Sequence, residues 1–184
     1  MLSGKLALVT GGASGIGFQI AKAFANEGAS LCIVDVNKNI DSVLKQLPDT
    51  SAHTAFKCDV SNSNDVKNLF DNIKKQYANI IPTVIVNSAG ITRDNLFLKL
   101  TEEDYDSVLN VNLKGTFLIT QAASKELILN NSQVNLENFK TYASIINIGS
   151  IVGRLGNVGQ ANYSASKAAV EGLTKTVARE LGNS

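Results

Sequence analysis

The sequence predicts an α/β domain in which a doubly wound parallel sheet has helices on both faces. Short apolar runs rich in Val, Ile, Leu and Ala alternate with longer segments of helical periodicity along the chain. This alternation is typical of βαβ units with right-handed crossovers, which make the strands parallel and bury both faces of the sheet. A length of 184 residues with 44% hydrophobic content suits one core. We therefore expect residues 1–184 to form a single domain.

The apolar runs define five expected strands, because each is short, almost uncharged and suited to burial on both faces. These strands are Lys5 to Thr10, Ser30 to Asp35, Thr54 to Asp59, Thr83 to Asn87 and Ser144 to Ile148. The helices between and after them are expected at Gly15 to Glu27, Asn37 to Leu47, Ser63 to Tyr77, Glu102 to Asn130 and Ala161 to Leu181. The polar stretch from Asn130 to Tyr142 is expected to be a surface loop.

Composition excludes several functional classes. The formal charge is +1 without long runs of like charge, so neither nucleic acid nor an anionic membrane is expected as a partner. No apolar run approaches the ~20 residues that a membrane span needs, and a strand from Lys5 leaves no room for a signal peptide. An intracellular location is therefore expected. Cys32 and Cys58 lie in or beside apolar runs and are expected to be reduced, and the single histidine, His53, gives no support for a metal site.

A glycine-rich turn, Thr10 to Gly17, lies between the first expected strand and the first expected helix. Glycines allow the backbone to turn sharply and to approach a pyrophosphate, whose charge is met by free amides and the positive end of the helix. In this position the turn predicts a Rossmann-like dinucleotide site. The residues expected to contact the cofactor here are Gly11, Ser14, Gly15, Ile16 and Gly17.

Asp35 ends the second expected strand, where a carboxylate can accept hydrogen bonds from both hydroxyls of an adenosine ribose. A 2′-phosphate would meet like charge there, so Asp35 favours NAD(H) over NADP(H). Ser14 agrees, because an arginine at that place could have met the phosphate. The alternative is that Asp35 only caps a helix beginning at Asn37.

Tyr163 and Lys167 stand one helical turn apart on the same face, so the ammonium can lie beneath the phenol. A nearby cation stabilises the phenolate, which allows a tyrosine to exchange protons at neutral pH. Ser150 is expected to offer a hydroxyl to a substrate oxygen. The alternative is a chance pair on a solvated helix, and the remaining motifs argue against it.

Taken together, these motifs resemble the short-chain dehydrogenase/reductase family over Lys5 to Gly182. In the family's order they are Thr10 to Gly17, Asp59-Val60, Asn87 to Gly90, Asn112, Ser150 and Tyr163-x-x-x-Lys167. Ser88 departs mildly from the usual Asn-Asn-Ala-Gly. The resemblance implies that Asp59 and Val60 flank the adenine, and that Asn87, Ala89 and Gly90 line the cofactor. It also implies a catalytic tetrad of Asn112, Ser150, Tyr163 and Lys167, of which Tyr163 and Lys167 also contact the cofactor.

Two further segments, Ala89 to Leu96 and Gly156 to Tyr163, resemble 3-oxoacyl-[acyl-carrier-protein] reductases. With Val111 to Phe117 and Ser150 to Gly153 they are also similar to an NAD-using mitochondrial branch of estradiol 17-beta-dehydrogenases. This implies an NAD(H)-dependent enzyme that reduces 3-oxoacyl thioesters, oxidises 17-beta-hydroxysteroids, or does both. It also implies location in the mitochondrial matrix, with the cytoplasm as the alternative.

The resemblance further implies a homo- or hetero-tetramer assembled through the long helices that begin near Glu102 and Ala161. Arg179 matches a basic position that helps the reductases bind an acidic acyl carrier protein. The alternative is that Arg179 simply complements the helix dipole. The polar insertion replaces a basic stretch of the bacterial relatives, which argues against carrier docking on this subunit.

Chains of this family usually continue for roughly sixty residues beyond the Tyr-Lys helix. We therefore expect a C-terminally truncated domain that lacks the last two strands. Its fifth strand would then form an open edge, with Ile145, Ile146 and Ile148 lacking neighbours. This raises a second functional hypothesis, a non-catalytic NAD-binding subunit of a hetero-oligomeric ketoacyl reductase. The complete tetrad argues against it, because a structural subunit needs neither Tyr163 nor Lys167.

Overall fold

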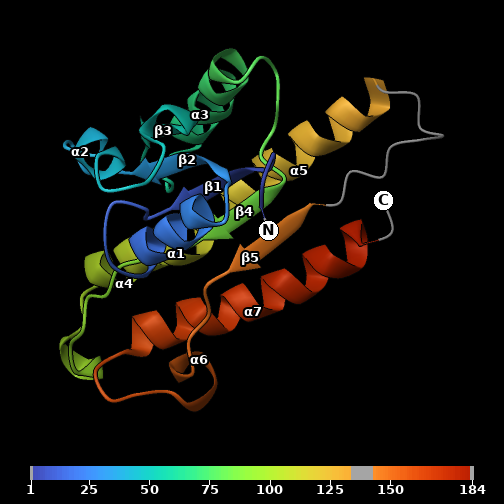
Figure 1. Cartoon of the computed structure of the whole chain (residues 1–184). Coiled ribbons are helices and arrows are strands. Elements are labelled where there is room, and N and C mark those ends of the chain that lie inside the picture. Colours follow the sequence, from blue (N-terminus) through green and yellow to red (C-terminus); the bar gives the residue numbers. More distant parts are fainter. Residues whose placement is uncertain (1, 134–142, 183–184) are drawn as a thin grey trace.

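The computed structural model describes residues 2–133 and 143–182 and confirms the predicted α/β architecture (Figure 1). Five parallel strands form one sheet in the order β3-β2-β1-β4-β5. The strands are β1 (Leu6–Thr10), β2 (Ser30–Asp35), β3 (His53–Lys57), β4 (Val84–Asn87) and β5 (Ser144–Asn147). Their bounds agree with the predicted ones to within two residues at each end. The order reverses at β1, whose neighbours are β2 on one side and β4 on the other.

The sheet is covered on both faces, and β1 shows why. Its side chains alternate, so that Leu6 and Leu8 enter one hydrophobic cluster while Ala7 and Val9 enter the other. The first cluster contains residues of α3 (Ser63–Gln76) and α5 (Thr116–Gln133), and the second contains residues of α1 (Gly15–Asn26) and α2 (Asp41–Leu44). A strand that is buried on both faces has apolar residues at successive positions, and this continuous apolar run predicted β1 from the sequence.

Helix α1 reaches the sheet through small residues. Gly17, Ala21 and Ala25 recur every fourth position and form its buried face. This spacing brings the helix axis close to β1 and β2, and it places the first turn of the helix at the carboxyl end of β1. The start of α1 is therefore fixed where the glycine-rich turn needs it.

The long helix predicted from Glu102 to Asn130 is instead composed of three parts. They are α4 (Glu102–Leu109), a π-helical segment (Asn110–Gly115) and α5. The helix start was predicted correctly, and Thr101 caps it by accepting a hydrogen bond from the amide of Asp104. A π-helical insertion often marks a functional site, and this one contains Asn112.

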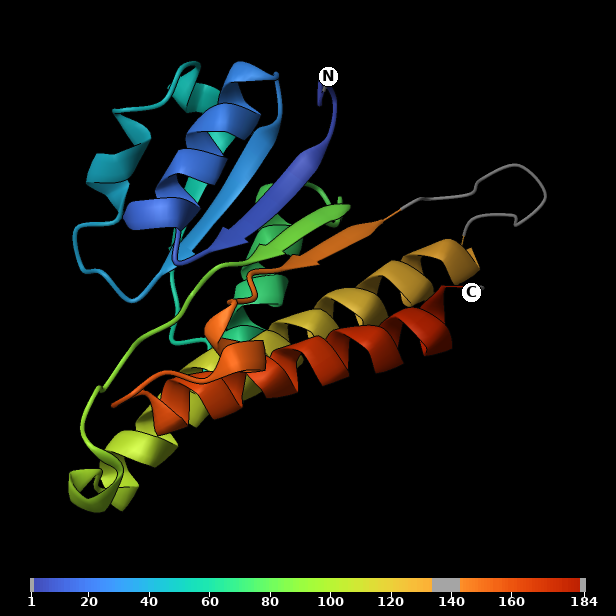
Figure 2. The same cartoon turned by 90° about the horizontal axis from the view of Figure 1, so that it is seen from below.

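Two other expectations are corrected. The helix predicted over Asn37 to Leu47 is α-helical only in α2. Beyond α2 the chain continues in turns of the 3₁₀ type, in which an amide bonds to the carbonyl three residues earlier, as Leu47 N does to Leu44 O. The sequence did not predict the short helix α6 (Val152–Leu155), which follows Ser150. The final helix, α7 (Ala161–Leu181), has the predicted bounds and borders a groove together with α5, beside which it runs in Figure 2.

Strand β5 is the last strand of the sheet within the described residues. Ile146 is 43% exposed there, as expected for an edge. The expectation that Ile145 and Ile148 lack neighbours is wrong, because each packs against one of the two hydrophobic clusters. These contacts, and the hydrogen bond from Ile148 N to Asn87 O, hold the end of β5 beside β4.

Most of the predicted loop from Asn130 to Tyr142 lies outside the described residues, although α5 extends to Gln133. Arg179 lies exposed in the last turn of α7, where both of its predicted roles remain predictions. None of the helices within the described part of the chain is both long and apolar enough to cross a membrane.

Candidate dinucleotide and catalytic site

The predicted site residues gather at the carboxyl ends of the strands, where the sheet order reverses. The glycine-rich turn follows β1 and the segment Asn87 to Gly90 follows β4, so the two lie side by side. Open α/β sheets bind ligands at such a switch point, because loops from neighbouring strands diverge there. The sheet therefore brings together residues that are far apart in the sequence.

The backbones of these two segments are in close contact. Gly11 has a φ of +64°, and a β-carbon on it would lie 2.8 Å from Ala89 Cα. Only glycine fits this conformation and spacing without strain. The hydroxyl of Thr10 accepts hydrogen bonds from the amides of Ser88 and Ala89, each at 3.1 Å. Thr10 was absent from the predicted contacts, although its place at the head of the glycine motif was a usable signal.

The first turn of α1 fits a dinucleotide phosphate. Ser14 precedes the helix in an extended conformation, and its side chain makes no capping hydrogen bond there. A β-carbon on Gly15 would meet open space, so the amide end of the helix is accessible. Ile16 is 64% exposed, which is apolar surface that a bound dinucleotide would cover.

Asp35 links the end of β2 to the glycine-rich turn. One carboxylate oxygen accepts a hydrogen bond from Ala13 N and the other from Asn37 N, both at 3.0 Å. The predicted alternative, a cap of a helix beginning at Asn37, is wrong because α2 begins at Asp41. The carboxylate instead lies beside the glycine-rich turn, to which it is bonded through Ala13 N.

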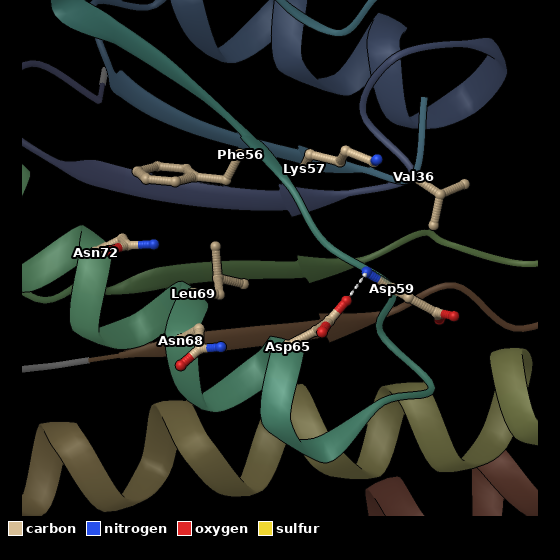
Figure 3. Close-up of a pocket in the computed structure, with 8 residues that line it drawn as sticks. All are labelled: Val36, Phe56, Lys57, Asp59, Asp65, Asn68, Leu69 and Asn72. Carbon is tan, nitrogen blue, oxygen red and sulfur yellow. Dashed lines mark hydrogen bonds between the residues drawn. The ribbon is translucent and has the colours of Figure 1, made fainter. Parts of the chain in front are cut away.

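Asp59 and Val60 lie at the other end of the predicted dinucleotide site. Asp59 accepts hydrogen bonds from the amide and hydroxyl of Ser61, and its own amide donates to Asp65 at 3.2 Å. Figure 3 shows this last bond at one end of a cavity of about 450 Å³, with Val36 above it. The cavity lies between the end of β3 and α3 and is lined by Val36, Phe56, Lys57, Asp59, Asp65, Asn68, Leu69 and Asn72.

Val60 also contacts the π-helical segment. A β-carbon on Gly115 would lie only 2.6 Å from Val60 Cγ2. The missing side chain therefore allows the π-helical segment to approach the residue predicted to flank the adenine. Through this contact the adenine end of the site and the segment that carries Asn112 are packed together.

Asn112 is 1% exposed and uses all its side-chain hydrogen-bonding groups. Its carbonyl oxygen accepts from Ile91 N at 2.8 Å, and its amide donates to Ile91 O at 3.0 Å and to Ser166 Oγ at 3.1 Å. A β-carbon on Gly90 would lie 3.2 Å from Asn112 Oδ1 and 3.9 Å from Lys167 Nζ. Gly90, Asn112 and Lys167 therefore converge on one point.

Tyr163 and Lys167 lie one turn apart on α7, as predicted. The Lys167 ammonium is 5.7 Å from the centre of the Tyr163 ring and donates to Ile148 O at 2.7 Å. Burial lowers the pKa of Lys167, because the surrounding protein solvates the charged form less well than water does. The Lys167 ammonium thus lies over the face of the Tyr163 ring, within cation–π distance.

Ser150 follows β5 and accepts a 3.4 Å hydrogen bond from Val152 N at the start of α6. Ser150 and Lys167 line the same cavity, which has a volume of about 430 Å³. Helix α6 is held against α7 by a bidentate pair from Arg154 to Glu171. Arg154, and then Lys175, hold the pKa of Glu171 down at about 2, so this carboxylate stays charged in the physiological range.

The Asn87 side chain joins β4 to α5 and β5. Its amide donates to Thr120 Oγ1 and to Asn147 Oδ1, which in turn ties β5 to α7 because Asn147 donates to Thr174. The side chain therefore supports the sheet, and the backbone from Asn87 to Gly90 is the part that can line a cofactor. Within the described residues no group of three metal-ligating side chains is assembled.

The fold and the site together define a dinucleotide-binding α/β protein with a tyrosine and a lysine at its switch point. The short chain dehydrogenase family model matches residues 5–184, and the chain belongs to this family. It is accordingly an oxidoreductase that acts on CH–OH groups, in a family that uses nicotinamide cofactors.

Known relatives support the same assignment. The chain is 43% identical over 190 residues to the (3R)-3-hydroxyacyl-CoA dehydrogenase of Homo sapiens, covering 98% of this chain and 69% of the relative. It is 44% identical over 190 residues to the enzyme of that name from Mus musculus, covering 98% and 70%. It is 41% identical over 182 residues to the 3-oxoacyl-[acyl-carrier-protein] reductase FabG of Thermotoga maritima, covering 98% and 69%.

Replacing Gly115 with Ala tests the contact between the π-helical segment and Val60. The added methyl group overlaps Val60, so we expect a loss of roughly 1–3 kcal/mol in the free energy of unfolding and NADH affinity lowered by about threefold or more. Fluorescence titration and thermal unfolding measure both. Gly172→Ala is the matched control, because a β-carbon there meets open space on an exposed face of α7. A Gly115→Ala protein that binds NADH as the wild type does would contradict the expectation.

Proposed function

We propose that this protein is an NAD(H)-dependent reductase of 3-oxoacyl thioesters, which it interconverts with 3-hydroxyacyl thioesters. The observation that carries the proposal is the convergence of Gly90, Asn112 and Lys167 beside Tyr163 at the switch point of the sheet. The names of the relatives, which describe 3-hydroxyacyl-CoA and 3-oxoacyl substrates, support the substrate class. Exposed apolar side chains follow Ser150 at Ile151, Leu155 and Val158, and they offer surface to an acyl chain.

Binding of the dinucleotide is assigned to the chain's own fixed groups. The first turn of α1 and the amides of the glycine-rich turn would hold the pyrophosphate, and Asp35 would accept the ribose hydroxyls. The backbone from Asn87 to Gly90 would lie along the nicotinamide half. When bound, the cofactor supplies or accepts the hydride.

Proton transfer is assigned to Tyr163. In the reducing direction, Ser150 and Tyr163 donate hydrogen bonds to the substrate carbonyl, and Tyr163 gives its proton to the oxygen as negative charge develops there. Lys167, held by Ile148 O, stabilises the phenolate that remains. In the oxidising direction the phenolate takes the proton back.

Reprotonation of Tyr163 needs a path to solvent, and we assign it to a water held by Asn112. Both amide hydrogens of the Asn112 side chain are used by Ile91 O and Ser166 Oγ, so the water would donate a hydrogen bond to an oxygen of Asn112. We assign it to the backbone carbonyl, which also accepts a hydrogen bond from Thr116 Oγ1 at 2.8 Å.

The Tyr163→Phe variant separates catalysis from binding. Removing the proton donor should lower kcat by roughly 10²–10⁴-fold, while NADH affinity stays within about twofold. Initial rates of the full-length protein with acetoacetyl-CoA and NADH measure the first, and fluorescence titration measures the second. Tyr105→Phe, an exposed tyrosine on α4, is the matched control.

Three outcomes decide between the functional hypotheses. Turnover by the wild type that disappears in Tyr163→Phe supports the enzyme. NADH binding without turnover, either alone or with a candidate partner subunit, would favour the non-catalytic subunit. Estrone in a parallel assay tests the 17-beta-hydroxysteroid activity, and turnover of estrone alone would overturn the thioester assignment.

Asp35 should set the cofactor preference. The wild type is expected to favour NADH over NADPH by about tenfold or more in kcat/KM, because a 2′-phosphate would meet the carboxylate. Asp35→Asn removes the charge and should bring the two cofactors to within a few-fold of each other. Asp41→Asn, an exposed acid on α2, should leave the preference unchanged. Equal use of both cofactors by the wild type would refute the assignment.

We also propose that copies of this chain, or of a related subunit, associate through α5 and α7. The two helices border a groove of about 370 Å³ that includes Phe117, Leu173 and Val177. Lys125 and Glu180 lie on the same groove, so opposite charges are available to a self-complementary interface.

Val177→Glu should break this assembly by placing a charge in an apolar interface. Light scattering after size-exclusion chromatography would show a tetramer for the wild type and smaller species for the variant. Val158→Glu is the control, because Val158 is exposed in the loop before α7 and lies off the groove. A wild-type monomer, or a Val177→Glu tetramer, would rule out this interface.

A further inference from the structure

Asn162, the residue directly before Tyr163, is completely buried, with 0% exposure. Its side-chain amide donates to Arg93 O at 2.9 Å and to Asp104 O at 3.4 Å, and its side-chain oxygen accepts from Tyr163 N at 2.7 Å. A buried amide whose hydrogen-bonding groups are all used fixes the elements that it joins, because moving any of them leaves a polar group unsatisfied. Here those elements are the segment after β4, the first turn of α4 and the first turn of α7.

Neighbouring hydrogen bonds extend this contact. Gln160 donates from its side chain to Asp94 Oδ2 at 2.9 Å, and Asn95 N donates to Gly159 O at 2.9 Å. Residues 159–162 are thus bonded to residues 93–95 along their length. The segment 93–95 continues directly from Gly90 and Ile91, which lie at the centre of the site.

The hydrogen bonds of Asn162 form one clamp, before Tyr163, and a second clamp of hydrogen bonds lies after Tyr163 on the same helix. Asn112 bonds to both backbone groups of Ile91 and donates to Ser166, whose hydroxyl donates to Tyr163 O at 2.8 Å. The segment 91–93 is therefore attached to the first turns of α7 at two points, by Asn162 before the tyrosine and through Ser166 after it. Two attachments fix both the position and the rotation of the helix that carries Tyr163.

We propose that Asn162 is a positioning residue, which sets the place of the Tyr163 phenol relative to the cofactor-lining turn by its two donations to Arg93 and Asp104. This role rests on the proposed function. Proton transfer depends steeply on geometry, and a displacement of about 1 Å lowers a rate by roughly 10²-fold. Loss of the hydrogen bonds of Asn162 should therefore slow the chemical step, while the dinucleotide site, built on β1 and β4, stays intact.

The test compares Asn162→Ala and Asn162→Asp with the wild type in the full-length protein. Aspartate keeps the acceptor for Tyr163 N but cannot donate to the two carbonyls. Both variants should lower kcat with acetoacetyl-CoA by roughly 10–100-fold, with NADH affinity within about twofold. The deuterium isotope effect with NADH labelled at the transferred position should rise, because the chemical step becomes rate-limiting. Asn26→Ala, an exposed asparagine at the end of α1, should leave both quantities unchanged.

A milder variant keeps the test decisive if the buried substitutions impair folding. Asp94→Ala removes only the exposed bond to Gln160, so it should lower kcat by a few-fold and raise the isotope effect in the same direction. An unchanged isotope effect in Asp94→Ala and in every Asn162 variant that folds, or full activity in Asn162→Asp, would overturn the role of Asn162. A wild type without turnover would refute the proposed function and this role together, whereas an active wild type with unaffected variants would refute this role alone.

Discussion

The burial of the Lys167 ammonium is the constraint on which the site depends. Removing an ammonium from water is unfavourable unless polar groups replace the lost solvent, and burial accordingly lowers its pKa. Ile148 supplies a carbonyl at 2.7 Å, and the Tyr163 ring faces the charge at 5.7 Å. Since Ile148 also bonds to Asn87, the pairing of β4 with β5 decides where the charge rests. The position of the Lys167 ammonium beside Tyr163 therefore depends on the pairing of strands in the sheet.

The π-helical segment positions a second buried side chain of the site, that of Asn112. Asn112 lies in this segment, and its side chain bonds to both backbone groups of Ile91 on the segment after β4. The same segment ends at Gly115, whose missing side chain leaves room for Val60. One local irregularity thus places both Asn112, which is proposed to hold a catalytic water, and the contact with Val60, which is proposed to flank the adenine. This explains why a helix that is regular in sequence pattern is interrupted in the structure.

Prediction from sequence worked where one local pattern decides the outcome. The strands were found because each contains a short, mostly apolar run, and α7 because its periodicity continues from Ala161 to Leu181. The break at Asn110–Gly115 was missed because it depends on the contact with Ile91, which the local sequence does not encode. Helix α6 was missed because it has four residues and is held by the pair of Arg154 with Glu171. The site residues were located by motif, but Asn162 became visible only through its hydrogen-bond partners.

The two halves of the site are held together by different means. The dinucleotide half depends on backbone proximity, as at Gly11 and Gly115, where a single added carbon would overlap a neighbour. The catalytic half depends on buried amide side chains, Asn112 and Asn162, whose hydrogen bonds cross from one element to another. Tightly packed backbone tolerates little adjustment. The hydrogen bonds that join residues 91–95 to residues 159–166 lie between loops and helix ends, and they can shift without unfolding the core. Substitutions of residues that make these hydrogen bonds can therefore alter the chemical step while cofactor binding is retained, because Asn162 bonds to Arg93 and Asp104 and not to the glycine-rich turn.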